Sequence, residues 1–435
     1  MALLENIKNN HPAFLETLKH RFLDNQRHAA LNKFLELGIP TKKDEEYRYT
    51  NLREITEKDY NFFPTETHTI SKEQIAQLHL GEENFDWIVF INGQLHKELS
   101  KISIENVEFL SFNFALNDAK HKEVFDNYFN TIAAKDLAFT NLNEAFCKHG
   151  FFLKVPKNMV IEKPIHVFYI SQNQQYNTFY NTRNLLIAEE GSKVEIIESH
   201  HNFDDTFVFT NSVTEIFTYQ NAKADWHKVQ NDSDTSYLMD HTFAKQERDS
   251  LTTVNTFTFG GKLVRNNLSF IHNGENINSF MNGITIIGGE QTVDHHTAVH
   301  HKTPNCESYQ NYKGIFKDKS HGVFNGKVFV DKIAQKTNAY QQNNNVLLSE
   351  GASIDTKPQL EIFADDVKCS HGCTVGQLNE DALFYLRARG ISKKEAQALL
   401  LYAFANDAME NIDIEPLKMK ISKLLAEKLE VDLEF

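Results

Sequence analysis

The chain has 435 residues, of which 41% are hydrophobic and 24% are charged, and its formal net charge is −14 at pH 7. This length suits two or three domains or one elongated solenoid, and the composition is that of an ordinary soluble protein. Nucleic-acid-binding proteins present a basic surface, so the acidic balance argues against that class.

The sequence shows no export signal and no membrane segment. Residues 1–6 are too polar for the core of a signal peptide. The longest apolar runs, such as 398–405, are far shorter than the ~20 residues that cross a bilayer. Four cysteines in a chain of this size do not make a disulfide framework. We therefore expect reduced thiols and a cytoplasmic location.

The first region, residues 1–150, is expected to be mainly helical. Within residues 13–37, apolar residues recur at helical intervals up to Gly38, which predicts one helix that ends there. The charged and aromatic segment 43–50 follows, and we interpret its acids as solvated charges rather than catalytic groups. Residues 87–91 predict a buried strand that is closed by an Asn-Gly turn.

The second region, residues 151–375, shows the alternation of β-branched and aromatic residues that is typical of strands. Its later part contains a repeat whose copies start 14, 16 and 17 residues apart. This period is too short for a βα unit and predicts a β-helix built of stacked short strands. We expect Asn343–Asn345 to stack as a ladder of amides. An antiparallel sandwich would show similar strand spacing and stays open as an alternative.

The third region, residues 376–435, is predicted to be helical. Residues 380–389 form one amphipathic segment, and Ser392 with Glu395 forms a capping box that opens a second. Glu415-Pro416 starts a third. We expect these helices to cap the open end of the solenoid or to form a docking surface, and capping is the simpler interpretation.

A thiol and an imidazole lie close together near the end of the second region. Cys369 and His371 are two residues apart, so on an extended strand their side chains emerge on one face. Sulfur and nitrogen side by side suit iron, zinc or copper. Cys373 is also at an even offset. Two ligands do not complete a site of four, so the remaining ligands would come from distant residues or a second subunit. A buried thiol and a hydrogen-bonded histidine without metal would give the same pattern.

A second histidine group lies at residues 294–301, where His296 and His300 share a face if the segment is extended. His296 is a candidate metal ligand on that geometry, although polar alternation on a solenoid face needs no function. Several other chemistries are absent from the sequence. Gly260-Gly261-Lys262 lacks the rest of a phosphate-binding loop, and there is no dinucleotide fingerprint, nucleophile elbow or His-Glu-x-x-His motif. We therefore expect a protein that is not an enzyme.

Four segments of the chain are similar to the SufB/SufD family of iron–sulfur cluster assembly proteins. They are residues 43–50, 343–345, 355–376 and 384–390. The resemblance is to the SufD members of the family more than to the SufB members. SufB members carry a glutamate-containing sequence where this chain has residues 368–371, and their scaffold cysteine falls near the asparagine run.

The resemblance implies a right-handed parallel β-helix flanked by N-terminal and C-terminal helical regions. It further implies a non-catalytic subunit of a cytoplasmic scaffold, which contacts SufB through the end of the β-helix and the ATPase SufC through the C-terminal helices. By the same resemblance, Cys369 and His371 hold transient iron or a nascent iron–sulfur cluster together with SufB, and so help iron to enter. A reduced flavin in the complex and a homodimer of the isolated chain are both compatible with it.

Two other functions fit parts of the sequence. One is a purely structural partner of SufB and SufC that never contacts metal. The other is a β-helix enzyme acting on an acidic polysaccharide, with Asp365 and Asp366 in a groove. That enzyme would call for an export signal and a basic cleft, and the sequence shows neither.

Overall fold

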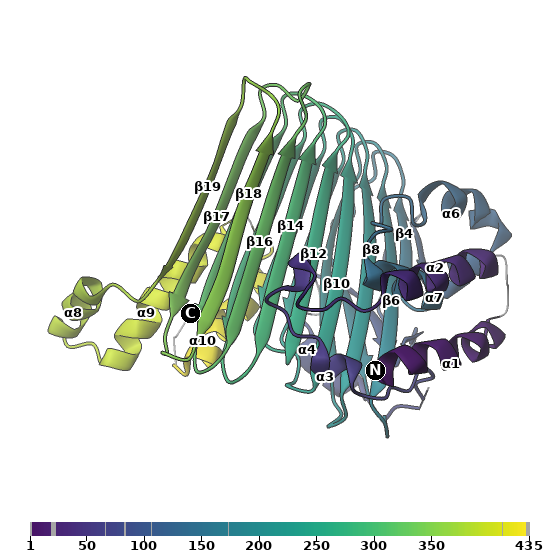
Figure 1. The fold of residues 1–435 in the computed structure, drawn as a ribbon, viewed down its shortest axis with the longest axis horizontal. Helices are drawn as coiled ribbons and strands as arrows, with labels where there is room; N and C mark the ends of the chain where they lie inside the picture. Colours follow the sequence, from purple (N-terminus) through teal and green to yellow (C-terminus); the bar gives the residue numbers. More distant parts are fainter. Residues whose placement is uncertain are drawn as a thin grey trace.

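The computed structural model describes residues 2–18, 23–65, 67–81, 84–105, 107–172, 174–410 and 412–431. They form a parallel β-solenoid with helices before and after it (Figure 1). From β4 onwards, successive strands alternate between two sheets, so that each turn of the solenoid adds one strand to each sheet. The ten-stranded sheet runs in the order β19-β17-β15-β13-β11-β9-β7-β5-β1-β2, and the nine-stranded sheet in the order β18-β16-β14-β12-β10-β8-β6-β4-β3.

The strands of the solenoid are about ten residues long in most turns, and the first strands of each sheet are shorter. The ten-stranded sheet contains β1 (Asp86–Ile91), β2 (Gln94–Leu95), β5 (Ile165–Ser171), β7 (Lys193–Asn202), β9 (Lys223–Gln230), β11 (Leu251–Thr258), β13 (Asn278–Ile287), β15 (Glu307–Phe316), β17 (Asn338–Leu347) and β19 (Lys368–Gly376). The nine-stranded sheet contains β3 (Glu108–Ser111), β4 (Phe151–Val155), β6 (Thr178–Ala188), β8 (Val208–Thr218), β10 (Ser236–Gln246), β12 (Leu263–His272), β14 (Thr292–His301), β16 (His321–Val330) and β18 (Ser353–Ile362).

The solenoid predicted from the sequence repeat is confirmed, but each repeat is one strand with its turn rather than a pair of short strands. Consecutive repeats therefore lie in different sheets. Register partners are one full turn apart, as where Glu307 lies opposite Asn338 and His321 lies opposite Ser353.

Amide ladders do form inside the solenoid, although the asparagine run does not make one. Gln341 Nε2 donates to Gln310 Oε1 of the previous turn at 3.0 Å. Asn345 Nδ2 instead donates to Asn343 Oδ1 of its own strand at 2.7 Å. The register explains the difference, because the residues opposite Asn343 are Tyr312 and Cys373.

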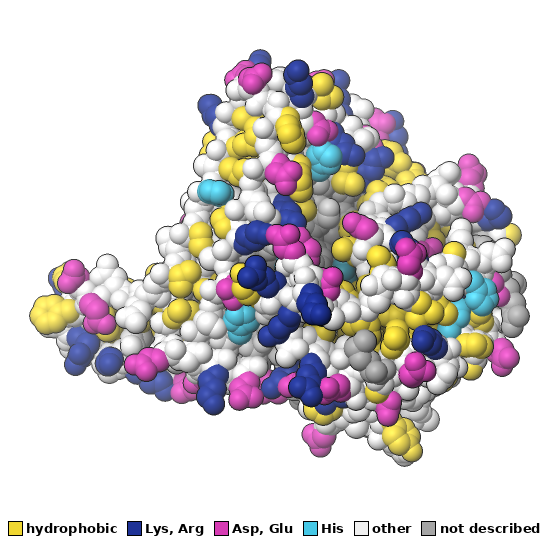
Figure 2. All heavy atoms as spheres, in the orientation of Figure 1, with side chains coloured by type: hydrophobic (Ala, Val, Ile, Leu, Met, Phe, Trp, Pro, Cys, Tyr) yellow, Lys and Arg dark blue, Asp and Glu magenta, His cyan; other side chains and the backbone are white. Residues whose placement is uncertain are grey.

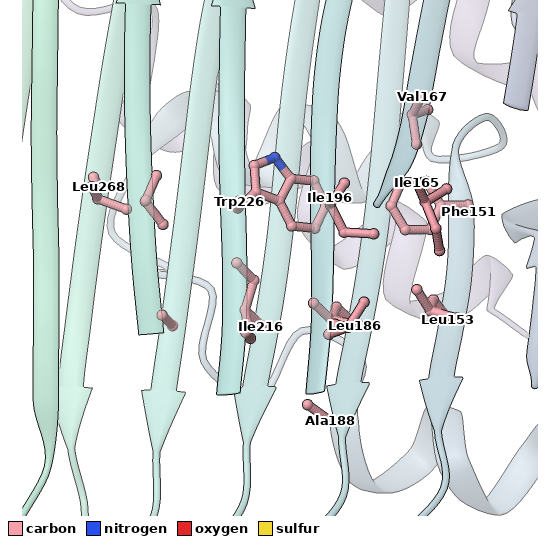
Figure 3. Packing of buried hydrophobic residues seen from close by; sticks show 14 of the residues in the cluster. Phe151, Leu153, Ile165, Val167, Leu186, Ala188, Ile196, Ile216, Trp226 and Leu268 are labelled. Carbon is pink, nitrogen blue, oxygen red and sulfur yellow. The ribbon is translucent and has the colours of Figure 1, made fainter. Parts of the chain in front are cut away.

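The space between the two sheets contains an apolar part and a polar part. Figure 3 shows the apolar part around Trp226, whose ring stacks on Phe151 with centroids 5.8 Å apart. At its border Trp226 Nε1 donates to Glu198 Oε2 at 3.2 Å, and the buried Lys228 pairs with the buried Asp240. Burying unpaired charges would be costly, so these pairings make the polar part compatible with folding.

Thirteen helical elements are present in the described ranges. They are α1 (Ala2–Glu16), α2 (Asp24–Leu37), η1 (Glu45–Tyr47), α3 (Arg53–Thr56), α4 (Lys72–Leu78), α5 (Phe112–Asn117), η2 (Ala119–His121), α6 (Lys122–Tyr128), α7 (Ala138–Phe146), α8 (Glu380–Ala388), α9 (Lys393–Asn406), η3 (Asp407–Met409) and α10 (Glu415–Leu429). None of these described helices combines the length and the apolar character needed to span a membrane.

The helices α1, α2 and α7 cover the outer face of the nine-stranded sheet. Phe34 of α2 and Phe146 of α7 belong to the same buried cluster as Phe179 and Phe209 of that sheet. The prediction of one helix over residues 13–37 is wrong, because α1 ends at Glu16 and α2 begins at Asp24. Both helices bury apolar residues in this cluster, which produces one periodic pattern across two elements. The predicted end at Gly38 is confirmed.

The C-terminal helices α9 and α10 cover the outer face of the ten-stranded sheet. Leu401 of α9 and Leu425 of α10 share a cluster with Ile284 and Ile315 of that sheet. The expectation that these helices cap the open end of the solenoid is therefore wrong. The outer face of the sheet carries the apolar residues that the helices bury. No residue of β18 or β19 belongs to this cluster. The capping box of Ser392 is confirmed, and α8 extends away from the body (Figure 1).

Candidate functional site at the open end of the solenoid

The solenoid ends in two strands that each have a single neighbour in the described chain. β19 pairs only with β17, and β18 pairs only with β16. The outer edge of each strand therefore presents unpaired backbone N–H and C=O groups. Figure 1 shows both strands at the left side of the solenoid, next to the projecting α8. We call this end, formed by β18 and β19, the open end.

The candidate ligands occupy lumen-facing positions at the open end. On β17 the lumen-facing residues are all buried, and these are Ala339, Gln341, Asn343 and Asn345. Their register partners on β19 are Cys369, His371, Cys373 and Val375. Side chains alternate along a strand, so these four residues lie in one row. The predicted common face of Cys369 and His371 is confirmed, and no further strand of the described chain pairs beyond it.

Each side chain of this row has its own surroundings. Cys369 is half-buried and packs beside Ala339 and Ala364. Burial raises the pKa of the Cys369 thiol, against a smaller opposing effect of its hydrogen bond with the Ala339 backbone. His371 is exposed. Cys373 is also exposed, and its Sγ donates to Thr356 Oγ1 of β18 at 3.2 Å. The thiol of Cys369 would thus become a thiolate ligand only on metal binding, which draws off its proton.

The row supplies an incomplete set of metal ligands. Neighbouring lumen-facing residues on a strand are about 6.6 Å apart at the backbone. In the described part of the chain, no three side chains of His, Cys, Asp or Glu converge at this end. Tetrahedral sites need four ligands. The open end can therefore contribute a thiolate and an imidazole to a site that another chain completes.

Sequence reasoning missed the contribution of β18 to the open end. The lumen-facing positions of this strand follow those of β16, and they place Ile354, Thr356 and Leu360 beside the β19 row. Just beyond the strand, the Phe363 side chain is 64% exposed. The alternation within residues 353–362 was a signal for these positions.

His296 lies away from the open end, on the outer face of the nine-stranded sheet. Its Nδ1 is 3.0 Å from Glu46 Oε2, and its Nε2 is 3.0 Å from Asp294 Oδ1. Arg265 pairs with the buried Asp294 and donates to the Glu46 carbonyl at 2.8 Å. His300 faces the same side but contacts Asp331 at 2.9 Å. Both nitrogens of His296 are next to carboxylates, which gives it a structural role, and metal binding by His296 stays a prediction.

The segment 43–50 is held against the sheet by this network. Besides its contact with His296, Glu46 Oε1 is 2.6 Å from Lys327 Nζ, and Glu45 pairs with Lys357. The hydrogen bond with His296 is the main cause that lowers the pKa of Glu46 to about 2, while burial opposes it. The interpretation of these acids as solvated charges is therefore wrong for Glu46, which is half-buried, and confirmed for Asp44 and Glu45, which are exposed.

A cavity of about 520 Å³ lies between this segment and the sheet, and its lining includes Lys42, Arg48 and Asp355. Figure 2 shows side chains of both charges next to one another on this face. The paired charges anchor the N-terminal region across the sheet.

The other two thiols, and the two acids considered for a β-helix enzyme, lie outside these sites. Cys147 and Cys306 are buried, and burial raises the pKa of each thiol. Both therefore act as small core residues. Asp365 and Asp366 are exposed on the turn between β18 and β19, where they do not face one another across a groove.

Comparison with known proteins identifies relatives over nearly the whole length of the chain. The family model described as "SUF system FeS cluster assembly, SufBD core domain" matches residues 168–404, and the model of the SufBD protein N-terminal region matches residues 4–167. The chain is 31% identical to the iron–sulfur cluster assembly protein SufD of Escherichia coli, over 93% of the chain and 92% of the relative.

Two further relatives show the same extent. An iron–sulfur cluster assembly SufBD family protein of Synechocystis is 30% identical, over 95% of the chain and 93% of that protein. SufD of Bacillus subtilis is 25% identical, over 97% of the chain and 95% of that protein.

Proposed function

Because this chain belongs to the SufBD family and acts in iron–sulfur cluster assembly, we propose that it is a non-catalytic subunit of a scaffold in which SufB covers its open end. The observation that carries the proposal is the pair of uncovered edge strands, β18 and β19, with Cys369 and His371 in the lumen-facing row of β19. Long exposed strand edges are sites where another chain adds its own strands. A partner there would also supply the missing ligands.

Iron is the cargo of this site. Cys369 and His371 offer the soft and borderline donors that suit iron, and further ligands from SufB complete its coordination. In this arrangement iron enters at the junction of the two subunits, and the nascent cluster forms there. A buried interface also protects the thiols from oxidation until the cluster has assembled.

The C-terminal helices are the proposed contact for the ATPase SufC. The exposed fractions of Phe384 and Tyr385 on α8 are 74% and 56%, large values for aromatic residues on a helix that extends from the body. Figure 2 shows hydrophobic side chains at this tip. Because α9 packs on the ten-stranded sheet, a force on α8 would reach the sheet that ends in β19. Motion driven by ATP would thereby open the interface.

A purely structural partner without metal contact is the alternative, and iron analysis separates the two. The chain is co-purified with SufB and SufC from its host, and iron and sulfide are measured anaerobically. The double variant Cys369→Ser/His371→Ala is compared with Ser370→Ala, which changes the outward-facing residue between them. We expect both complexes to form, and the double variant to lose most of its iron and sulfide. Equal loading in the double variant would establish the structural alternative.

A further inference from the structure

A second group of metal-ligand side chains lies at the other end of the molecule. His68, His96 and Glu98 each offer a ligand atom, and the three atoms lie within 4.8 Å of one another. This is the sole such group of three in the described ranges. His96 and Glu98 directly follow β2, and His68 lies in the segment before α4, next to the β1–β2 hairpin at the edge of the ten-stranded sheet that is opposite β19.

The imidazole rings of His68 and His96 are in direct contact. They meet edge to face, with centroids 4.4 Å apart. His96 Nδ1 is 2.9 Å from Glu98 Oε1. His68 Nδ1 and His96 Nε2 are both buried atoms without a hydrogen-bond partner. A buried polar atom without a partner is unfavourable unless a ligand occupies it.

The backbone holds His68 in place on both sides. The Thr67 carbonyl accepts from Asn92 Nδ2 at 3.3 Å, and the Thr69 N–H donates to Gln172 Oε1 at 2.8 Å. Asn92 and Gly93 have positive φ angles of 52° and 83°, as a tight Asn-Gly hairpin turn requires.

The backbone of His96 is held as well, because its N–H donates to the Val89 carbonyl at 2.9 Å. Both histidines are thus fixed by elements of the fold, while the Glu98 side chain is 66% exposed and is held by its contact with His96.

We propose that His68, His96 and Glu98 bind a divalent transition-metal ion, either zinc or ferrous iron, at the surface of this hairpin. Two imidazoles and one carboxylate are the donor set that both ions accept, with water in the open positions. Zinc–nitrogen bonds of about 2.0–2.1 Å place neighbouring donors about 3.4 Å apart. The three ligand atoms therefore need only small side-chain rotations to close on an ion. This site is independent of the proposed role of the open end.

The test is a competition titration of the full-length chain with a chromophoric chelator, once with Zn²⁺ and once anaerobically with Fe²⁺. It is carried out in the Cys369→Ser/Cys373→Ser background, so that thiols at the open end are not counted. We expect one site for at least one of the ions, with an affinity that falls at least tenfold in His68→Ala and in Glu98→Gln. X-ray absorption of the loaded chain should show nitrogen and oxygen donors only.

His300→Gln is the matched control, because it removes a histidine that pairs with a single carboxylate, Asp331, at 2.9 Å. It should leave the number of ions and their affinity unchanged. Melting temperatures in metal-free buffer show that each variant is folded. Binding that is equal in the parent, His68→Ala and Glu98→Gln would overturn the proposal, as would the failure of both ions to bind. The relative affinities for Zn²⁺ and Fe²⁺ show which of the two ions this site prefers.

Discussion

The two-residue period of a strand is what places Cys369 and His371 on the same face. Their spacing sets them on one face of β19, and the sequence was sufficient to predict this. The lumen-facing residues of earlier turns are covered by the next turn, whereas this row is covered by none in the described chain. The same residue pattern in an inner strand would be a core position. What makes the pair available is therefore its location in the last turn, which spacing does not encode.

The contacts of Glu46 could not be predicted from the sequence, because its partners are far away along the chain. Its partners His296 and Lys327 are 250 and 281 residues away along the chain. A charged loop after a helix is ordinarily solvated. Only the fold brings this loop onto the sheet, where the outward-facing polar residues become its partners.

Glu46→Gln should destabilise the chain at pH 7 and matter less in acid. The hydrogen bond with His296 lowers the pKa of Glu46 to about 2, so the stabilisation is complete above the unfolded pKa of about 4.3 and is lost as the pH falls towards 2. The carboxylate is 39% exposed, so screening limits the loss to about 1 kcal/mol. The melting temperatures of parent and variant should differ at pH 7 and converge below pH 4. A difference that is constant with pH would contradict this.

At the scale of elements, the edge of β19 can be tested without touching its ligands. The Lys368 N–H donates to the Thr337 carbonyl beside β17 at 2.9 Å. N–H groups alternate in direction along a strand, so that of Thr374 points to β17 and that of Val375 to the open side. Val375→Pro should therefore leave the melting temperature nearly unchanged and weaken co-purification with SufB, because it removes an edge donor.

Thr374→Pro is the counterpart, since it removes a donor within the sheet and should cost about 1–3 kcal/mol of stability. Both variants are purified alone for thermal unfolding and then with SufB. Full retention of SufB by Val375→Pro would show that this edge does not pair with the partner.

The helices illustrate what patterns predict at this scale. The capping box at Ser392 fixed the start of α9 from local chemistry. The apolar face of α9 also showed that it is buried, but not against which surface. Its partners Ile284 and Ile315 are strand residues whose outward direction depends on the solenoid register. The expected cap at the open end was wrong for that reason.

At the scale of the whole molecule, the repeat predicted the solenoid but not its polar interior. Buried histidines line part of it, such as His295 with Thr285 and His301 with Ser308, at 2.9 Å in each case. Alternating sequences suggest which residues face inward, and an apolar lumen is the usual assumption. The polar lumen is compatible with folding because its members pair between facing strands, as these two histidines do, or between successive turns, as Gln341 and Gln310 do. Both kinds of pairing depend on the three-dimensional register.

These histidines should make the molecule sensitive to mild acid. Burial lowers the pKa of His301 to about 3 and that of His295 to about 4. A histidine that is neutral in the folded state contributes its full stabilisation above its unfolded pKa of about 6.5. Below that pH, each such histidine lowers the free energy of unfolding by about 1.4 kcal/mol per pH unit. The melting temperature should therefore fall steeply from pH 7 to pH 5, where carboxylates scarcely titrate. An unchanged melting temperature over this range would contradict it.

Hydrogen–deuterium exchange tests the role of the open end most directly. Amide exchange is compared between the isolated chain and the chain co-purified with SufB, strand by strand. If SufB covers the open end, exchange in β18 and β19 should slow strongly on complex formation, while inner strands such as β11 and β12 stay as they are. Unchanged exchange in β18 and β19 within a stable complex would show that SufB binds elsewhere and that Cys369 and His371 do not lie at the interface.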